Sequence, residues 1–419
     1  MTQLDERDMT DSTADAVSAA SRGAAEYRAN PYPVYARLRE SAPVCRLSPP
    51  HGVDTYLITR YDDAKAALTD PRISKDMYAA MDAYHTIFGD SSVALDDNML
   101  FSDPPKHTRL RRIVNSAFSP RRIESLHPRI QQVTDELLER CPTDAPIDLL
   151  SSFAFPLPLV VICELIGIPE DEREEVQQWC ATVARTGFSK ADKEKLAQAE
   201  GTLRDYFAGL IVRKHKNASD DLLSDLIRTQ DEQGALTDGE LLSTLWVLLF
   251  AGHKTTAYLI GNAVFTLLNH RDQLEEILAD PALLPNAIEE VLRFEGSVEN
   301  GTFRHALEDI TIRGTLIPKG SLVQIALSSA NRDPEKFSCP DSFDVRRQGL
   351  QSTHLGFGSG PHYCLGAPLT RMEMRTALTT LFQKFPKIEL ASEASEAEWL
   401  KVPFPAFRGL ERLPVKLVP

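Results

Sequence analysis

A glycine-rich segment near the C-terminus ends in a cysteine that could act as a metal ligand. Glycines stand at positions 356, 358 and 360, and the residues that follow Cys364 have apolar side chains at helical spacing. Glycines allow the backbone to turn tightly and to approach a planar ligand closely. Cys364 would stand at a helix N-terminus, where the amide groups and the helix dipole favour a thiolate. The segment therefore predicts a thiolate ligand for a soft metal such as iron.

Two other interpretations of this loop fit the sequence less well. Glycine-rich loops at helix N-termini also bind phosphate. Here, however, no Lys-Ser or Lys-Thr pair follows the glycines, and no βαβ unit is predicted around them. The other alternative is a buried structural cysteine. Phe357 and His362 stand seven and two residues before Cys364, and this combination favours the ligand.

The stretch Gly356–Arg371 resembles the cysteine loop of the cytochrome P450 family in its soluble bacterial form. The resemblance covers nearly the whole chain, with the motifs in the family's order. It implies that Cys364 is the axial ligand of a haem iron, with Phe357 and Gly358 in the loop around its sulfur. The family has Leu-Ala-Arg where this chain has Leu-Thr-Arg. The implied cofactors are haem b and O₂, with NAD(P)H used only indirectly through redox partners.

Basic side chains in three separate segments could bind the haem propionates. His107 and Arg111 stand four residues apart in a predicted helix, so both reach one side of it. The resemblance gives these two residues, together with Arg304 and His362, the role of binding the propionates. Two partly buried carboxylates need cationic partners. Each of these residues could instead be a solvated surface cation.

The longest apolar helical pattern, from residue 240 to about 269, contains a possible oxygen site. Gly252 lies inside this pattern, where a glycine costs about 1 kcal/mol relative to alanine. Its presence indicates either close helix packing or room for a ligand. The resemblance implies that Ala251 and Gly252 make space for dioxygen and that Thr255 hydrogen-bonds to it.

Lys254 stands where the family usually has Asp or Glu, directly before the threonine. That acid belongs to the route that brings protons to dioxygen, so an ammonium group reverses the local charge. In one interpretation, Lys254 pairs with an acid elsewhere and water carries protons from Thr255. In a second, His253 or a group of the substrate helps. In a third, the chemistry depends less on the usual relay, as in epoxidation, oxidative coupling or peroxide-driven oxidation. We favour the first.

A Glu-x-x-Arg element precedes the cysteine loop by about 70 residues. Glu290 and Arg293 would share one face of a helix. Alone, such a pair is an ordinary surface interaction, worth about 0.2–0.5 kcal/mol. By the resemblance it belongs to a buried network that a later arginine completes. Arg346 and Arg347 both lie in the right region, and the sequence does not choose between them.

By the resemblance, a substrate pocket for a large, mostly apolar ligand lies above the haem. For each residue, ordinary core packing is the alternative. The expected lining residues are Met77, Met81, Val93, Phe188, Phe250, Val298 and Phe404.

These residues are expected in a mainly helical fold with small β-sheets, in which the haem lies between the long central helix and the cysteine loop. Residues 1–25 are expected to form a disordered polar tail, and residues 26–419 a single catalytic domain. Residues 72–102 have mixed signals and could form a functional loop or two short helices. Predicted helices span 104–117, 122–140, 151–167, 170–187, 191–216, 219–230 and 240–269, and predicted strands lie within 301–313, 321–327 and 403–417.

The composition excludes several classes of protein. The chain has 419 residues and a net charge of −14, so nucleic acid is an unfavourable partner. Six cysteines are too few for a disulfide framework in a chain of this length, which indicates a reducing compartment, and they contain no Cys-x-x-Cys pair of the kind found in zinc sites. Neither a signal peptide nor an apolar run long enough to span a membrane is predicted. We therefore expect a cytoplasmic protein, and we expect it to be a monomer.

The resemblance implies a haem-thiolate monooxygenase that inserts one oxygen atom from O₂ into a largely apolar natural product. Hydroxylation or epoxidation in polyketide or macrolide biosynthesis is the expected reaction. Oxidative coupling or peroxide-driven oxidation is one alternative, and a non-catalytic homologue that acts as a partner protein is another. We expect electrons to come from a ferredoxin and its reductase. The ferredoxin could dock on a basic patch of Arg109, Arg112, Arg371 and Arg375.

Overall fold

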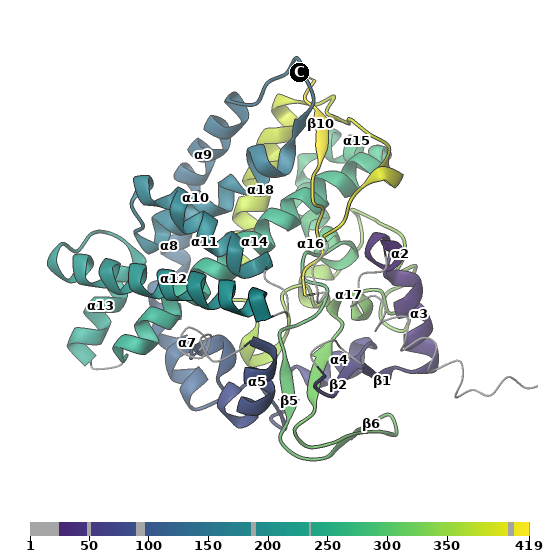
Figure 1. Ribbon diagram of the computed structural model, residues 1–419. Coiled ribbons are helices and arrows are strands. Elements are labelled where there is room, and N and C mark those ends of the chain that lie inside the picture. Colours follow the sequence, from purple (N-terminus) through teal and green to yellow (C-terminus); the bar gives the residue numbers. More distant parts are fainter. Residues whose placement is uncertain are drawn as a thin grey trace, which may run out of the picture.

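A 32-residue helix, α14 (Asp238–Asn269), runs through the middle of the molecule (Figure 1). The computed structural model describes residues 25–47, 52–88, 97–185, 190–233, 236–400 and 406–418. α14 begins with a capping box, in which the Thr237 hydroxyl accepts from the Glu240 amide and the Glu240 carboxylate accepts from the Thr237 amide. The structure confirms the long apolar helix that the sequence predicted.

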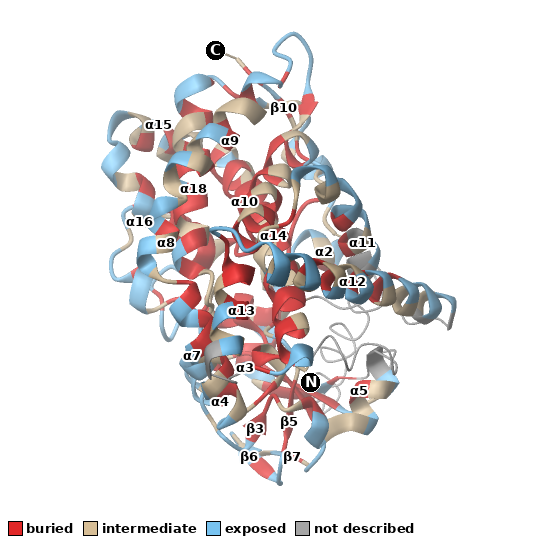
Figure 2. Cartoon of the chain, turned by 90° about the vertical axis from the view of Figure 1, so that its left-hand side faces the viewer, coloured by how far each residue is buried: buried red, intermediate tan, exposed pale blue. Residues whose placement is uncertain are grey.

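The other helices surround α14, and α10 and α18 pack directly against it. Figure 2 shows buried residues concentrated in these three central helices and exposed residues on the outer ones. The helices are α2 (Ala25–Ala29), α3 (Tyr32–Ser41), α4 (Tyr61–Ala67), α5 (Met81–Phe88), α7 (Lys106–Ala117), α8 (Pro120–Ser125), α9 (His127–Glu139), α10 (Pro156–Ile166), α11 (Arg173–Arg185), α12 (Lys190–Lys216), α13 (Leu222–Gln233), α15 (Arg271–Ala279), α16 (Leu284–Phe294), α17 (Leu327–Ala330) and α18 (Ala367–Lys384).

Two predicted helices are interrupted in the structure. The segment predicted over 122–140 is divided into α8 and α9, and Pro128 lies in the first turn of α9. Proline is favoured there because its missing amide would have no partner inside the helix. The segment predicted over 151–167 starts with a π-helical turn, Leu150–Ala154, before α10. α10 ends at Ile166 and is capped by Gly167, whose φ of 95° is left-handed.

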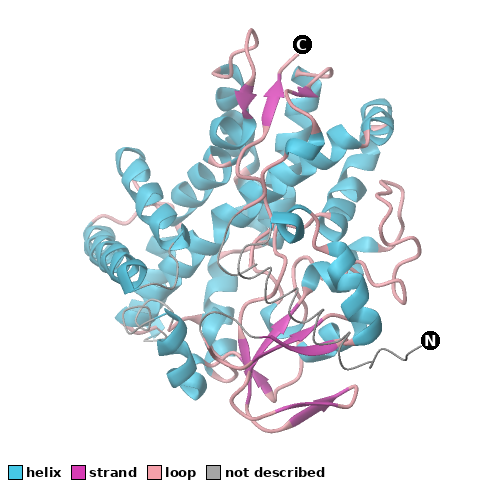
Figure 3. Ribbon diagram, turned by 45° about the vertical axis from the view of Figure 1, so that its right-hand side comes forward, coloured by secondary structure: helices cyan, strands magenta, loops and turns pink. Residues whose placement is uncertain are grey.

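The strands gather at two opposite ends of the molecule (Figure 3). A five-stranded sheet has the order β1-β2-β8-β5-β3, with β2 and β8 parallel and the other pairs antiparallel. A three-stranded sheet has the order β4-β10-β9, and β6 and β7 form a separate hairpin. The strands are β1 (Val44–Leu47), β2 (Thr55–Ile58), β3 (Ile73–Ser74), β4 (Ile147–Asp148), β5 (Arg304–Ala306), β6 (Ile310–Ile312), β7 (Thr315–Ile317), β8 (Leu322–Ile325), β9 (Glu389–Leu390) and β10 (Pro414–Lys416).

The fold is mainly helical with small sheets, as predicted. The ambiguous segment 72–102 contains the short strand β3, the helix α5 and two 3₁₀ turns, Met77–Ala80 and Met99–Phe101. The expected N-terminal tail lies outside the described residues except for its last position. Among the helices that the structure describes, none is both long and apolar enough to cross a bilayer.

Candidate active site

The glycine-rich loop before α18 closes on itself around Cys364. The Cys364 amide donates to the Phe357 carbonyl at 3.0 Å, and the Gly358 amide donates to the Leu355 carbonyl at 2.8 Å. Gly358 and Gly360 have φ values of 72° and 74°, a left-handed conformation that glycine adopts without strain. A Cβ atom at Gly360 would also lie 2.6 Å from Cγ2 of Thr69. The glycines are therefore required by the shape of the loop.

The Cys364 thiol stands just before the N-terminus of α18. Burial raises the pKa of this thiol, while the backbone amides of Gly366 and Ala367 and the charge of Arg111 act to lower it. The Arg111 guanidinium donates to the Tyr363 carbonyl at 2.8 Å, so it is anchored beside the loop. These groups would stabilise the thiolate form that a metal ligand requires.

A cavity of about 270 Å³ lies between this loop and α14. Thr255 lines it, and its hydroxyl donates to the Ala251 carbonyl at 2.9 Å. Gly252 also lines it, but a Cβ at this position would meet the Ile162 side chain of α10 at 3.0 Å. Gly252 thus allows α14 to pack closely against α10, and it also leaves space in the cavity. The predicted site residues that line the cavity are Ala251, Gly252, Thr255, Arg111, Arg304, His362, Phe357, Gly358, Cys364 and Val298.

Of the two histidines predicted to hold propionates, His362 lines the cavity, and His107 contacts His362 without lining the cavity itself. The rings of His107 and His362 are 4.2 Å apart between centroids. His107 is buried, and neither of its ring nitrogens has a hydrogen-bond partner among the described residues. A buried polar group without a partner is rare in a folded protein, so these nitrogens suit a ligand that accepts hydrogen bonds.

Lys75 is a cation of the same region that the sequence analysis did not identify. It lines the cavity, and its ammonium donates to the Thr302 hydroxyl at 2.7 Å. Burial, followed by the charge of Arg304, lowers its pKa well below the usual value. Burial also lowers the pKa of Arg304 to about 10, while Asp103 opposes this shift. Lys75 lies in the ambiguous segment 72–102, where no sequence motif predicted a residue that binds the propionates.

The basic residues of this cluster suit the carboxylates of a haem. Lys75, Arg111 and Arg304 all line the cavity. Two partly buried propionates need cationic partners of this kind. Together with the thiol of Cys364 across the same cavity, these residues fit haem as the bound group.

Lys254 does not line the cavity, although it stands next to Thr255 in the chain. Its side chain is buried, and its ammonium donates to the Cys180 carbonyl of α11 at 3.3 Å. The neighbouring His253 contacts the Leu249 carbonyl through Nδ1 at 2.7 Å, and burial lowers its pKa to about 4. The ammonium that replaces the family's acid therefore faces α11, and His253 is neutral near pH 7.

The buried network around Glu290 is completed by Arg347. Arg293 donates to the two carboxylate oxygens of Glu290 at 2.7 Å each, and Arg347 donates to the same carboxylate at 3.2 Å. Arg346 instead pairs with Glu276 at 2.7 Å on the surface. Arg293 also donates to the carbonyls of Asn331, Pro340 and Ser342. The network thus fastens α16 to the segment that leads into the cysteine loop.

The predicted substrate-pocket residues divide into three groups. Val298 lines the cavity. Met77, Met81 and Phe250 are not among its lining residues, and Phe250 stacks on Trp246 with centroids 5.1 Å apart. The remaining predicted residues, Val93, Phe188 and Phe404, lie outside the described residues. The apolar lining residues that the prediction missed are Leu68, Met99, Leu100, Phe118, Ile162, Val247, Leu248, Leu259, Leu292, Leu327, Leu365 and Leu369.

Comparisons with known proteins agree with this geometry. The family model described as Cytochrome P450 matches residues 172–397. The chain is 43% identical to the cytochrome P450 monooxygenase PikC of Streptomyces venezuelae, over 93% of this chain and 92% of that protein. It is 39% identical to the polyketide biosynthesis cytochrome P450 PksS of Bacillus subtilis, over 94% and 97% of the two chains.

A solved structure of a relative has the same fold. The P450 enzyme CxnD, described as acting in C–S bond formation in chuangxinmycin biosynthesis, superposes with a TM-score of 0.87 at 42% identity. The match covers 93% of this chain and 94% of CxnD. With a cysteine loop and a cationic cluster that both fit haem, the chain belongs to the cytochrome P450 family and is an enzyme of its monooxygenase class.

Proposed function

We propose that the protein inserts one oxygen atom from O₂ into a largely apolar natural product of the polyketide or macrolide type, by hydroxylation or epoxidation. The observation that carries the proposal is the cavity itself, which has the Cys364 loop on one side and α14 on the other. Its walls are mainly apolar, with side chains such as Leu248 and Val298. A mainly apolar cavity with few polar groups suits an apolar ligand. The 39% identity to PksS, a protein named for polyketide biosynthesis, supports this substrate class.

As a P450, the protein uses haem iron and O₂, and haem supplies the activation of O₂ and the transfer of one of its oxygen atoms. Cys364 would hold the iron, and the cationic cluster of Lys75, Arg111 and Arg304 would hold the propionates. The Thr255 hydroxyl would donate a hydrogen bond on the α14 side, after turning from the Ala251 carbonyl that it now contacts. The apolar side chains around the cavity would exclude bulk water and orient the substrate.

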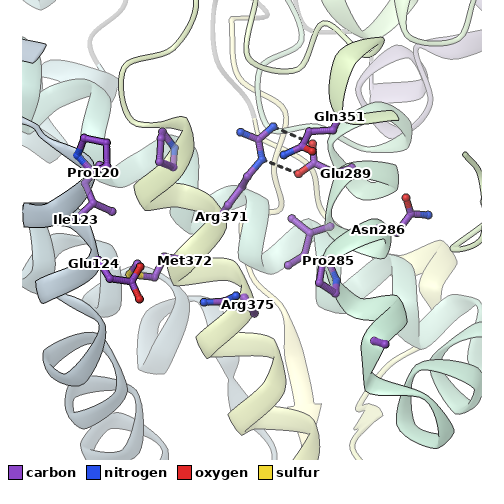
Figure 4. Close-up of a pocket in the computed structure, with 13 residues that line it drawn as sticks. Pro120, Ile123, Glu124, Pro285, Asn286, Glu289, Gln351, Arg371, Met372 and Arg375 are labelled. Carbon is purple, nitrogen blue, oxygen red and sulfur yellow. Dashed lines mark hydrogen bonds and ion pairs between the residues drawn. The ribbon is translucent and has the colours of Figure 1, made fainter. Parts of the chain in front are cut away.

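We propose that the electrons come from a ferredoxin, which its reductase reduces with NAD(P)H. A surface hollow of about 550 Å³ between α8, α16 and α18 contains Arg371 and Arg375 of the predicted basic patch, which supports docking of the ferredoxin there (Figure 4). Arg371 lies in the hollow with its guanidinium on Glu289, at 2.6 and 2.9 Å, and the exposed Arg375 lies beside it. Arg109 pairs with Glu240 of α14 and does not line the hollow. We propose that the protein works as a monomer in the cytoplasm.

Oxidative coupling is the second candidate function. Its support is the 42% identity to CxnD, whose description names C–S bond formation. The position of Lys254 also supports it, because a coupling reaction depends less on the acid that this chain lacks. The two candidates differ in one respect: a monooxygenase product retains an atom of O₂, whereas a coupling product retains none.

The first experiment is a titration of the Soret band of the ferric holoenzyme with macrolactones, linear polyketides, terpenoids and cyclic peptides. A saturable shift toward shorter wavelength with the macrolactones or polyketides would support the substrate class. A shift only with another class would overturn it. The selected compound is then turned over under ¹⁸O₂ with a ferredoxin and its reductase. One ¹⁸O atom in the product would support monooxygenation, and an unlabelled coupled product would support the second candidate.

A further inference from the structure

Residues 297–302, which follow α16, form one wall of the cavity. The members of this wall that line the cavity are Ser297, Val298, Gly301 and Thr302. Glu299 does not line the cavity, although it directly follows Val298, and its side chain is buried. The carboxyl group of Glu299 therefore lies behind the wall, inside the protein. The proposed reaction gives this buried group no role.

Two tyrosines of the N-terminal helices hold the Glu299 carboxyl group. Tyr27 of α2 and Tyr35 of α3 donate to the same carboxyl oxygen, at 2.8 and 2.7 Å. Their hydroxyl oxygens are 2.8 Å apart, and their rings meet edge to face with centroids 6.0 Å apart. Both tyrosines are buried. A buried carboxyl group requires hydrogen-bond partners, and these partners stand 272 and 264 residues away in the chain.

The main chain of Glu299 connects these contacts to the wall. Its amide donates to the Ala406 carbonyl at 3.1 Å, and its carbonyl accepts from the Ser328 amide at 3.1 Å. The preceding residue, Val298, is paired with Phe407 in a β-bridge. Val298 and Glu299 share a planar peptide group, so a shift of one residue moves the other. The two tyrosine hydroxyls are therefore coupled to an apolar side chain of the cavity.

A third tyrosine of the same helices holds the start of the wall. Tyr32 of α3 donates to the Glu295 carboxylate at 2.8 Å, and Arg408 donates to the same carboxylate oxygen. The Arg408 amide also donates to the Ser297 carbonyl at 2.9 Å. Glu295 and Glu299 stand two residues before and two residues after Ser297. The N-terminal helices thus bind the chain on both sides of a residue that lines the cavity.

The pattern of these contacts differs from that of an ordinary buried tyrosine. Tyr61 of α4 is also buried, and its hydroxyl donates to a backbone carbonyl, that of Thr353. One such bond satisfies a buried hydroxyl group. In the N-terminal helices, three hydroxyls instead converge on two carboxyl groups that flank one wall of the cavity. This convergence indicates that the contacts hold the wall at a defined position.

We propose that Tyr27 and Tyr35, acting through Glu299, are positioning residues that fix the cavity wall and thereby determine how the substrate is oriented. The proposal rests on the proposed function, because it takes the cavity as the substrate site. Orientation strongly affects a rate, since a displacement of about 1 Å at the reacting atoms lowers it on the order of 100-fold. Loss of a tyrosine hydroxyl should therefore change which position of a substrate is oxidised, while the cysteine loop keeps its geometry.

The first test probes the wall without turnover. The ferric holoenzyme is titrated with imidazole and with 4-phenylimidazole, which both bind the iron through nitrogen and shift the Soret band to longer wavelength. Only the second ligand has a ring that must fit against the apolar walls. Tyr35→Phe and Tyr27→Phe should each raise the Kd of 4-phenylimidazole several-fold and leave that of imidazole unchanged. A ratio of the two Kd values equal to that of wild type would overturn the proposal.

The matched control is Tyr206→Phe. It also removes a tyrosine hydroxyl that donates to a glutamate, here Glu172 at 2.6 Å, and neither residue lines the cavity. This variant should bind both ligands as wild type does. If it changes the ratio as much as Tyr35→Phe, the effect does not come from the wall, and the proposal is wrong.

The second test asks whether the tyrosines act through Glu299. Glu299→Gln keeps an oxygen that accepts hydrogen bonds, whereas Glu299→Leu has none, so the leucine variant should bind 4-phenylimidazole more weakly than the glutamine variant. Adding Tyr35→Phe to Glu299→Leu should cause no further change, because residues that share one interaction are not additive. A full additional effect of Tyr35→Phe in the leucine variant would show that the tyrosine acts by another route, which contradicts the proposal.

The third test uses the substrate selected above. Tyr35→Phe should change the ratio of products oxidised at different positions several-fold, while the thiolate-type spectrum of the carbon-monoxide-bound protein stays as in wild type. A lowered melting temperature with an unchanged product ratio and unchanged ligand binding would show a structural role only, which overturns the proposal. If wild type oxygenates no compound of the panel, the substrate class fails, and the comparison of imidazole with 4-phenylimidazole still decides the role of the tyrosines.

Discussion

The backbone amide of Cys364 donates to the carbonyl of Phe357 at 3.0 Å, so the glycine loop closes beneath the cavity before α18 begins. The hydrogen bond fixes the cysteine relative to the loop. The thiol therefore meets the cavity at one position, opposite Ala251 and Thr255 of α14.

Replacing Cys364 with alanine should abolish the thiolate-type spectrum of the reduced, carbon-monoxide-bound protein, because the sulfur that would bind iron is removed. Oxidation of substrate should be lost with it. The matched control is Cys339→Ala, which removes an exposed thiol. It should keep the full spectrum. A thiolate spectrum that survives in the Cys364 variant would show that another residue is the ligand.

Replacing Gly360 with alanine should destabilise the cysteine loop. The new Cβ would have a left-handed φ of 74° and would lie 2.6 Å from Cγ2 of Thr69. The control Gly349→Ala has nearly the same φ, 73°, with no atom within 4 Å, so it should cost only the conformational part, about 1 kcal/mol. The Gly360 variant should lose clearly more in thermal unfolding. Adding Thr69→Ser, which removes Cγ2, should recover part of the difference; equal losses in both glycine variants would contradict the steric argument.

Replacing Arg347 with alanine should destabilise the fold far more than replacing Arg346. The Arg347 side chain is 11% exposed and donates to the fully buried Glu290, whereas the Arg346 side chain is 60% exposed in its pair with Glu276. Removing one partner of a buried ion pair costs about 3–5 kcal/mol, but an exposed pair contributes about 0–1 kcal/mol. Urea unfolding of the two variants measures the difference. Similar losses of stability in the two variants would show that Arg347 is not the arginine that completes the buried network.

The folded protein should become less stable in acid because Glu289 is protonated there. Burial alone would raise the pKa of Glu289, but hydrogen bonds from Arg371 and His354 outweigh it and lower the pKa to about 2. An unfolded glutamate has a pKa of about 4.3. The folded pKa is the lower one, so this contribution is present above about pH 4.3 and is lost as the pH falls toward 2.

The contribution of Glu289 should be on the order of 3 kcal/mol, because its pKa falls from about 4.3 to about 2 on folding and each unit of pKa shift corresponds to about 1.4 kcal/mol. The measurement compares the melting temperature of wild type and Glu289→Gln across this acidic range. The variant should be less stable at neutral pH, and the difference should shrink as the pH falls. A constant difference at every pH would mean that the ionised form of Glu289 is not what stabilises the fold.

The sequence determined those features that depend on neighbours in the chain. The glycines at 356, 358 and 360 and the helix after Cys364 are local, and they predicted the loop correctly. The spacing of Glu290 and Arg293 on one helix also predicted their ion pair. Helix periodicity located α14, but it missed the break between α8 and α9, since apolar spacing continues across Leu126, where one helix ends and the next begins.

Only the tertiary structure decided which residues meet from distant segments. In the folded chain, Lys75 belongs to the cationic cluster. Arg347, and not Arg346, pairs with Glu290, and the Lys254 ammonium donates to the Cys180 carbonyl of α11. These outcomes depend on how the helices pack, because burial and charge partners come from residues far apart in the chain. Local residue patterns fix an element and its faces, whereas packing fixes what each face contacts.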